Sequence, residues 1–90
     1  MSVHHLDAYH AWVERESPAA SARVAALVFL LSVGDQPWQA PSVPVPELSD
    51  QPRDEVRAAA LTAPAGASVW IWYRHVYADG AVEIIEITSD

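Results

Sequence analysis

The last third of the chain restricts the fold more than any other feature. Residues 69–78 read VWIWYRHVYA and residues 81–88 read AVEIIEIT, so two segments rich in aromatic and β-branched residues flank Asp79-Gly80. An Asp-Gly pair supplies the positive φ angles of a two-residue turn, and the pattern therefore predicts an antiparallel β-hairpin over residues 69–88.

A two-residue loop at Asp79-Gly80 fixes the register, so that Trp72 faces Ile87 and Arg74 faces Ile85. One face of the predicted hairpin then carries Trp70, Trp72, Arg74, Val76, Glu83, Ile85 and Ile87, and the other carries Val69, Ile71, Tyr73, His75, Tyr77, Val82, Ile84 and Glu86. Because neither face is polar, each face needs a covering layer.

Two helices are expected before the hairpin. Residues 2–15 carry apolar side chains at three- and four-residue steps, which is typical of an amphipathic helix. Ser17-Pro18 is a helix-start pair and predicts a second helix over residues 17–32. This second helix is apolar nearly all round, so we expect it to be buried on more than one side, in the core or between the sheet and a second subunit.

The middle of the chain is predicted to be a long loop over residues 35–53, because five prolines fall within it. Residues 54–61 have a helical composition but also alternate, so helix and strand both remain open. The order of elements predicts a single α+β domain over residues 1–90, in which an N-terminal helical hairpin packs on a small antiparallel sheet that ends in the C-terminal β-hairpin.

Charge and cysteine content exclude several classes of protein. The 90 residues have a formal net charge of −7, five arginines, no lysine and no cysteine. A disulfide scaffold and a thiolate metal site are thereby excluded, and the acidic balance argues against a nucleic-acid partner. The longest apolar run, Val24–Leu31, is far shorter than the about 20 residues of a membrane span. No signal segment is visible, so we expect a cytoplasmic protein without a membrane partner.

Few residues could carry chemistry. His4, Asp7 and His10 share a helix face, but no fixed metal motif supports them, and we predict neither metal nor cofactor. Metal-free RNA cleavage needs a base, an acid and a cation, and the only candidate set is Arg57, Tyr73, Arg74 and His75. The opposing interpretation is that Arg74 pairs diagonally with Glu83 and that the aromatic residues form the core of the sheet.

Tryptophans are the main candidates for partner binding. Trp70 and Trp72 lie two residues apart and therefore on one face of a strand, where they would form either core or an interface hot spot. Trp38 in the proline-rich loop and Tyr77 near the hairpin turn complete the expected partner-binding set.

Three stretches together resemble the ParE/RelE superfamily of bacterial type II toxins: Trp12–Leu31 (WVERESPAASARVAALVFLL), Glu55–Arg57 (EVR) and Val69–Ile87. The resemblance implies a helical hairpin on a small antiparallel sheet, and neutralisation by a small antitoxin. ParE-like members act on DNA gyrase, whereas RelE-like members cut mRNA on the ribosome. By position, Arg57 and Arg74 match arginines of the family's middle strands, and Tyr73 matches its tyrosine.

Two departures from the family pattern affect the expected function. The family opens with a β-strand, but only Met1–Val3 precede the first helical pattern here, and the family's C-terminal basic cluster is replaced by Thr88-Ser89-Asp90. The second departure argues against RNA cleavage. We therefore expect a toxin component that acts by protein binding. A non-toxic dimeric interaction module and a metal-free ribonuclease are the alternatives.

Overall fold

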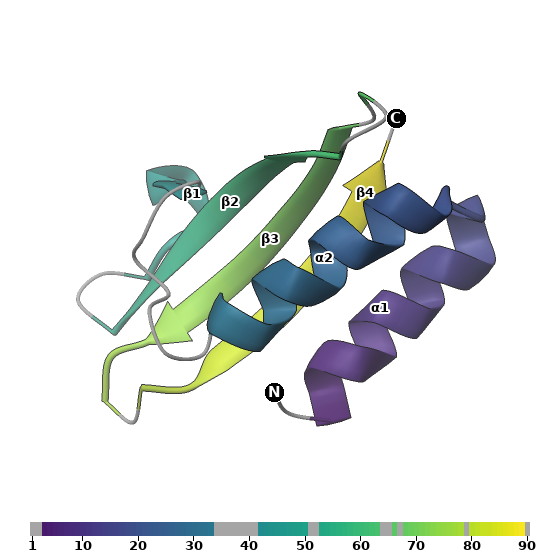
Figure 1. The fold of residues 1–90 in the computed structure, drawn as a ribbon. Coiled ribbons are helices and arrows are strands. Elements are labelled where there is room, and N and C mark those ends of the chain that lie inside the picture. Colours follow the sequence, from purple (N-terminus) through teal and green to yellow (C-terminus); the bar gives the residue numbers. More distant parts are fainter. Residues whose placement is uncertain are drawn as a thin grey trace.

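Two helices cover one face of an antiparallel sheet (Figure 1). The computed structural model describes residues 3–33, 42–50, 53–63, 66, 68–78 and 80–89, with the side chains of residues 3–5 excepted. The described elements are α1 (Val3–Glu16), α2 (Ala20–Val33), β1 (Ser42–Pro44), the 3₁₀ helix η1 (Pro46–Leu48), β2 (Asp54–Thr62), β3 (Ser68–Val76) and β4 (Val82–Ser89). The strands follow chain order, β1-β2-β3-β4. The predicted α+β class is confirmed.

The turn between the helices differs from the prediction. The Ser17 amide donates to the Val13 carbonyl at 2.9 Å, and Ser17 has a φ of +46°. Ser17 therefore terminates α1, because a residue in the left-handed helical conformation commonly ends a helix at its C-terminus. The second helix begins at Ala20 instead of at the predicted Ser17-Pro18 start, and the Ala19 carbonyl accepts the Arg23 amide at 3.1 Å.

Polar contacts join the end of α1 to the free edge of β4. The Glu16 carboxylate accepts hydrogen bonds from the Ser89 amide at 2.9 Å and the Ser89 hydroxyl at 3.0 Å, and the Arg15 guanidinium donates to the Ile87 carbonyl. The Trp12 indole nitrogen also donates to the Ser89 hydroxyl, at 3.2 Å. The end of α1 thus satisfies backbone groups that an edge strand would otherwise expose.

The proline-rich segment contains regular structure that the loop prediction over residues 35–53 omitted. β1 pairs with β2 through Ser42↔Ala59, Val43↔Ala58 and Pro44↔Arg57. Proline is tolerated there because β1 is at the edge of the sheet. Residues 54–62 form β2, which resolves the open choice between helix and strand. Residues 34–41 and 51–52 lie outside the described residues.

The predicted hairpin register is wrong, because the strands close at another pair of residues than the turn prediction assumed and because β4 contains a β-bulge. The Val76 amide donates to the Ala81 carbonyl at 2.9 Å, so the hairpin closes at Val76 and Ala81 and not at the predicted pair Ala78 and Ala81. Tyr73 pairs with Ile84, whereas the next residue back along β3, Trp72, pairs with Glu86. Ile85 is consequently the extra residue of a bulge. The bulge places both Ile84 and Ile87 in the core, where an unbroken register would send them to opposite faces.

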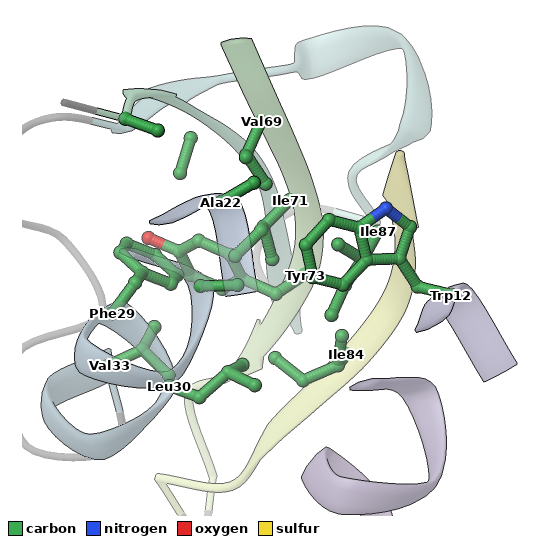
Figure 2. Close-up of a cluster of buried hydrophobic side chains, with 13 residues drawn as sticks. Trp12, Ala22, Phe29, Leu30, Val33, Val69, Ile71, Tyr73, Ile84 and Ile87 are labelled. Carbon is green, nitrogen blue, oxygen red and sulfur yellow. The ribbon is translucent and has the colours of Figure 1, made fainter. Parts of the chain in front are cut away.

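The core lies between the helices and the sheet (Figure 2). Its buried side chains are Trp12 from α1; Ala22, Ala26, Phe29, Leu30 and Val33 from α2; Ala59 from β2 and Ala63 directly after it; Val69, Ile71 and Tyr73 from β3; and Ile84 and Ile87 from β4. Val24, Val28 and Leu31 point away from the sheet and are 59%, 61% and 63% exposed. Within this chain α2 is therefore not a core helix covered on more than one side, and the alternative that a second subunit covers this face stays a prediction.

Candidate functional site on the outer face of the sheet

The residues proposed for RNA cleavage are divided between the two faces of the sheet. Alternate side chains of a strand point to opposite faces. Tyr73 lies in the core beneath the helices, and its partner on β2 is Arg57. Arg74 lies on the opposite face, which we call the outer face. The sheet itself thus separates one candidate cation from the other.

Arg57 and Tyr73 meet at a buried serine. The Arg57 guanidinium donates from Nε to the Ser42 hydroxyl at 2.9 Å and from Nη2 to the Ser42 carbonyl at 3.0 Å, and it also bonds to the Glu55 carboxylate. The Tyr73 hydroxyl lies 2.8 Å from the Ser42 hydroxyl. The Arg57 side chain is only 11% exposed. This cluster fastens β1 to the sheet, and the hydrogen-bonding groups of Arg57 are engaged within the fold.

The two polar partners of Arg57, Glu55 and Ser42, differ in how far the sequence indicates them. Glu55 and Arg57 alternate along β2, so their common face was readable once the segment was known to be a strand. Ser42 lies in the proline-rich segment, 15 residues before Arg57, and carries no pattern that points to it.

Arg74 and His75 also have partners within the fold. The Arg74 Nε lies 3.4 Å from the Asp54 carboxylate. The predicted partner of Arg74, Glu83, is its cross-strand neighbour, but the ion pair is formed with Asp54 from the strand on the other side. The His75 ring packs edge-on against Tyr77, with ring centroids 5.2 Å apart.

A stacked pair of tryptophans lies on the outer face. The Trp70 and Trp72 rings are 6.2 Å apart between centroids and are inclined by only 25°. Trp70 is 39% exposed and Trp72 is half-buried. Both helices pack on the other face of the sheet (Figure 1). These two tryptophans thus lie outside the helix-side core, and the interface alternative stays a prediction.

The neighbours of the tryptophans leave room on one side and place charge on the other. On β2 the cross-strand partners of Trp70 and Trp72 are Ala60 and Ala58. On β4 the partner of Trp72 is Glu86, which is exposed. Ala60 is exposed whereas Ala58 is only 8% exposed, so the β2 side adds a small apolar surface beside the indoles, and β4 borders it with a carboxylate.

The remaining predicted partner-binding residues are not part of this surface. Tyr77 lies in the hairpin loop beyond the end of β3, is 44% exposed and packs on His75. Trp38 lies outside the described residues.

A groove of about 680 Å³ lies between α1 and the start of β4. Its lining is mainly apolar, with Asp7 and Glu83 as the two carboxylates. Among the side chains that the structure describes, no three histidine, aspartate or glutamate residues gather as metal ligands. Of the three residues weighed for a metal, Asp7 and His10 are exposed on α1, and the side chain of His4 lies outside the described part.

Comparisons with protein-family models, with curated proteins and with solved structures gave no match to this chain. The ParE/RelE resemblance therefore stays a prediction from the sequence. Over the described residues, no helix is long and apolar enough to cross a membrane.

Proposed function

We propose that this chain acts by binding another protein, as the toxin component of a ParE/RelE-like toxin–antitoxin module in the bacterial cytoplasm. The observation that carries this proposal is the stacked Trp70–Trp72 pair on the outer face, away from the helices. Tryptophan is enriched at the centres of protein interfaces, where a few residues supply most of the binding energy. A small antitoxin is the expected partner, and DNA gyrase is a candidate cellular target.

The arrangement of the cations favours protein binding over RNA cleavage. Four of the five arginines, Arg15, Arg53, Arg57 and Arg74, have a carboxylate oxygen no farther than 3.9 Å away. Phosphate binding requires cations that are available to the ligand, and a net charge of −7 repels a polyanion.

Growth and binding measurements test the proposal together. We expect induced expression of the chain to arrest bacterial growth, and co-expression of the small protein encoded beside it to restore growth and to co-purify with the chain. Trp70→Ala and Trp72→Ala should each weaken that complex at least tenfold, as interface hot spots do. Leu48→Ala is the control, because it removes an exposed apolar side chain from η1, outside the predicted partner-binding set. Unchanged growth together with no bound neighbour would contradict the proposal.

The exposed face of α2 favours a second candidate, a non-toxic homodimeric interaction module. Val24, Val28 and Leu31 follow one another at steps of four and three residues, which is the spacing of a helix-pairing seam. The only charged residue of α2 is Arg23, so two copies of this helix meet no pair of carboxylates.

Sedimentation at about 1 to 100 μM decides this candidate. A dimer that Val28→Glu dissociates, and that Val43→Glu leaves intact, would support it. Val43 is a suitable control because it is equally exposed, at 61%, but lies on β1. A wild-type monomer at the highest concentration would exclude the dimeric module.

A further inference from the structure

We propose that the Trp70–Trp72 surface binds a cationic, arginine-bearing segment of the partner protein. This inference rests on the proposed function, since it names the chemistry of the partner at the same surface. Three observations support it: the geometry of the indole pair, the carboxylates that border it, and the neutralised state of the one arginine on that face.

The indole pair offers an aromatic face to a ligand. Trp70 and Trp72 stack at 6.2 Å with 25° between their planes, and Trp70 retains 39% of its surface in solvent. Indole is the best aromatic partner for a cation placed over its ring, and the planar guanidinium of arginine stacks on such rings while its N–H groups remain free to donate. An arginine side chain therefore gains more from this surface than an aliphatic side chain of similar size.

The edge of the surface supplies the opposite charge. Glu86 is exposed and faces Trp72 across the β3–β4 pair, and Glu83 is exposed two pairs further along the same strand. A guanidinium over the Trp72 ring would lie near a carboxylate that no arginine of the described residues engages. Hydrogen bonds between an arginine and a carboxylate are stronger than neutral ones and fix orientation.

Arg74 does not oppose this charge preference. It is the arginine of β3 on the outer face, and its Nε lies 3.4 Å from the Asp54 carboxylate. With Arg74 neutralised, Glu83 and Glu86 determine the sign of the potential along β4. An acidic partner segment would face these two carboxylates and the net charge of −7, whereas a basic segment is attracted by both.

A second copy of the chain fits this surface less well than a basic segment. Pairing two copies through their tryptophans would bring together two surfaces that each carry the exposed carboxylates of Glu83 and Glu86. Like charges brought together at an interface are unfavourable. The seam on α2 is the surface at which two copies can approach without that repulsion.

A peptide titration tests the inference on the intact chain. The probe is a labelled nine-residue peptide with three arginines spaced by glycine and serine, and the comparison peptides replace arginine with citrulline or with glutamate. We expect saturable binding of the arginine peptide by fluorescence anisotropy at 0.15 M salt, and none of the two comparison peptides. Citrulline keeps the shape of arginine without its charge, so this comparison isolates the cation.

Variants then locate the binding surface. Trp72→Leu keeps an apolar side chain in place and should weaken binding about fivefold through loss of the cation–π contact. Glu86→Gln should weaken it about threefold, while Glu14→Gln, which removes the same charge from the exposed surface of α1, should change it less than twofold. Circular dichroism identical to wild type verifies that each variant is folded.

Two results would overturn the inference. One is arginine-peptide binding that is equal in wild type, Trp72→Leu and Glu86→Gln, because it would mean non-specific attraction to an acidic protein. The other is a natural partner that depends on Trp70 and Trp72 but contacts them through an acidic or uncharged segment. In that second case the proposed protein-binding function stands and only the basic character of the partner is wrong. Failure of the proposed function itself would appear as unaffected growth with no bound neighbour.

Discussion

Single residues hold the edges of this small sheet. Ser42 is 7% exposed and accepts hydrogen bonds from Arg57 Nε at 2.9 Å while its hydroxyl lies 2.8 Å from that of Tyr73. β1 is only three residues long, so it depends on such side-chain contacts for its attachment. The arginine that the sequence marks as a candidate catalytic residue therefore has a structural task in the folded chain.

Replacing Ser42 with alanine should destabilise the protein. Ser42→Ala removes the acceptor of the Arg57 Nε bond and leaves buried polar groups without it, which typically costs about 1–3 kcal/mol. Chemical denaturation monitored by tryptophan fluorescence measures this change. Ser32→Ala is the matched control, because Ser32 is exposed on α2 and bonds only to its own helix, through the carbonyls of Val28 and Phe29. Equal stability of Ser42→Ala and wild type would refute a fastening role.

Glu16 makes the stability of the fold dependent on pH. Burial acts to raise the pKa of its carboxyl group, but the hydrogen bonds from the Ser89 amide and hydroxyl and from Arg15, together with the Arg15 charge, outweigh burial and leave the pKa below its ordinary value. A carboxyl whose pKa is lower in the folded state stabilises the fold above its unfolded pKa, and this stabilisation disappears as the pH falls through the folded pKa.

We therefore expect Glu16→Gln to lower the free energy of unfolding at neutral pH. The difference from wild type should be constant above about pH 5 and shrink as the pH falls below about 4, because an unfolded glutamate titrates near 4.3. Urea denaturation of both proteins from pH 3 to pH 7 measures the difference. Glu14→Gln controls for the loss of one negative charge from α1. A difference that stays the same down to pH 3 would show that protonation of Glu16 does not weaken the contact with β4.

Among the elements, β4 shows how packing sets register. The turn-based register paired Trp72 with Ile87, but the observed register pairs Trp72 with Glu86 and leaves Ile85 as the bulge residue. The bulge allows Ile84 and Ile87, which are 9% and 1% exposed, to enter the same core, and it leaves Ile85 44% exposed. Burial of two isoleucines outweighs the disruption of one ladder position.

Alanine substitutions along β4 test this register. Ile84→Ala and Ile87→Ala should each lower the unfolding free energy by about 2–4 kcal/mol, since both empty a place in the core. Ile85→Ala should cost less than about 1 kcal/mol, because its side chain is largely in solvent. Thermal denaturation of the three variants gives the order directly. In the turn-based register Ile85 and Ile87 would share the outer face with Trp70 and Trp72, so a large loss at Ile84 alone, with little at Ile87, would contradict the bulge.

The elements differ in how far the sequence predicts them. The two helices and the hairpin strands are carried by local periodicity, which persists in the structure with end shifts of a few residues. β1 was not predicted, because Ser42–Pro44 has no alternating pattern and forms a strand only through its pairing with β2. The bulge at Ile85 was likewise not predicted, because it depends on the packing of Ile84 and Ile87 against residues of α1 and α2.

The candidate site was predicted in part for the same reason. The two-residue spacing of Trp70 and Trp72 placed them on one face, and that holds in the structure. The sequence does not decide which face of the hairpin is buried against the helices, because both faces are apolar. Only the packing of α2 against Tyr73, Ile71 and Val69 decides that the tryptophans lie outside the core.

At the scale of the whole molecule, the distribution of charge separates protein binding from RNA cleavage. Twelve acidic residues outnumber five arginines, and the carboxylates that pair with Arg57 and Arg74 come from neighbouring positions on β2. The cations that a nuclease would present to phosphate are therefore engaged within the fold, on opposite faces of the sheet. The overall field adds repulsion at longer range, within the Debye length of about 8 Å at physiological salt.

We expect the folded chain neither to bind nor to cleave RNA. At 0.15 M salt the dissociation constant for a labelled 20-nucleotide RNA, measured by fluorescence anisotropy, should exceed about 10⁻⁴ M, which is the weak end of ordinary non-specific binding. Programmed ribosomes incubated with the chain should retain intact mRNA. Any trace of cleavage should be the same with Tyr73→Phe and Arg74→Ala, which identifies a contaminant. The opposite outcome is cleavage that one of these substitutions abolishes in a variant with wild-type circular dichroism. It would show that the Arg74–Asp54 or Tyr73–Ser42 contact rearranges and presents these residues to RNA. RNA cleavage would then replace protein binding as the activity of this fold.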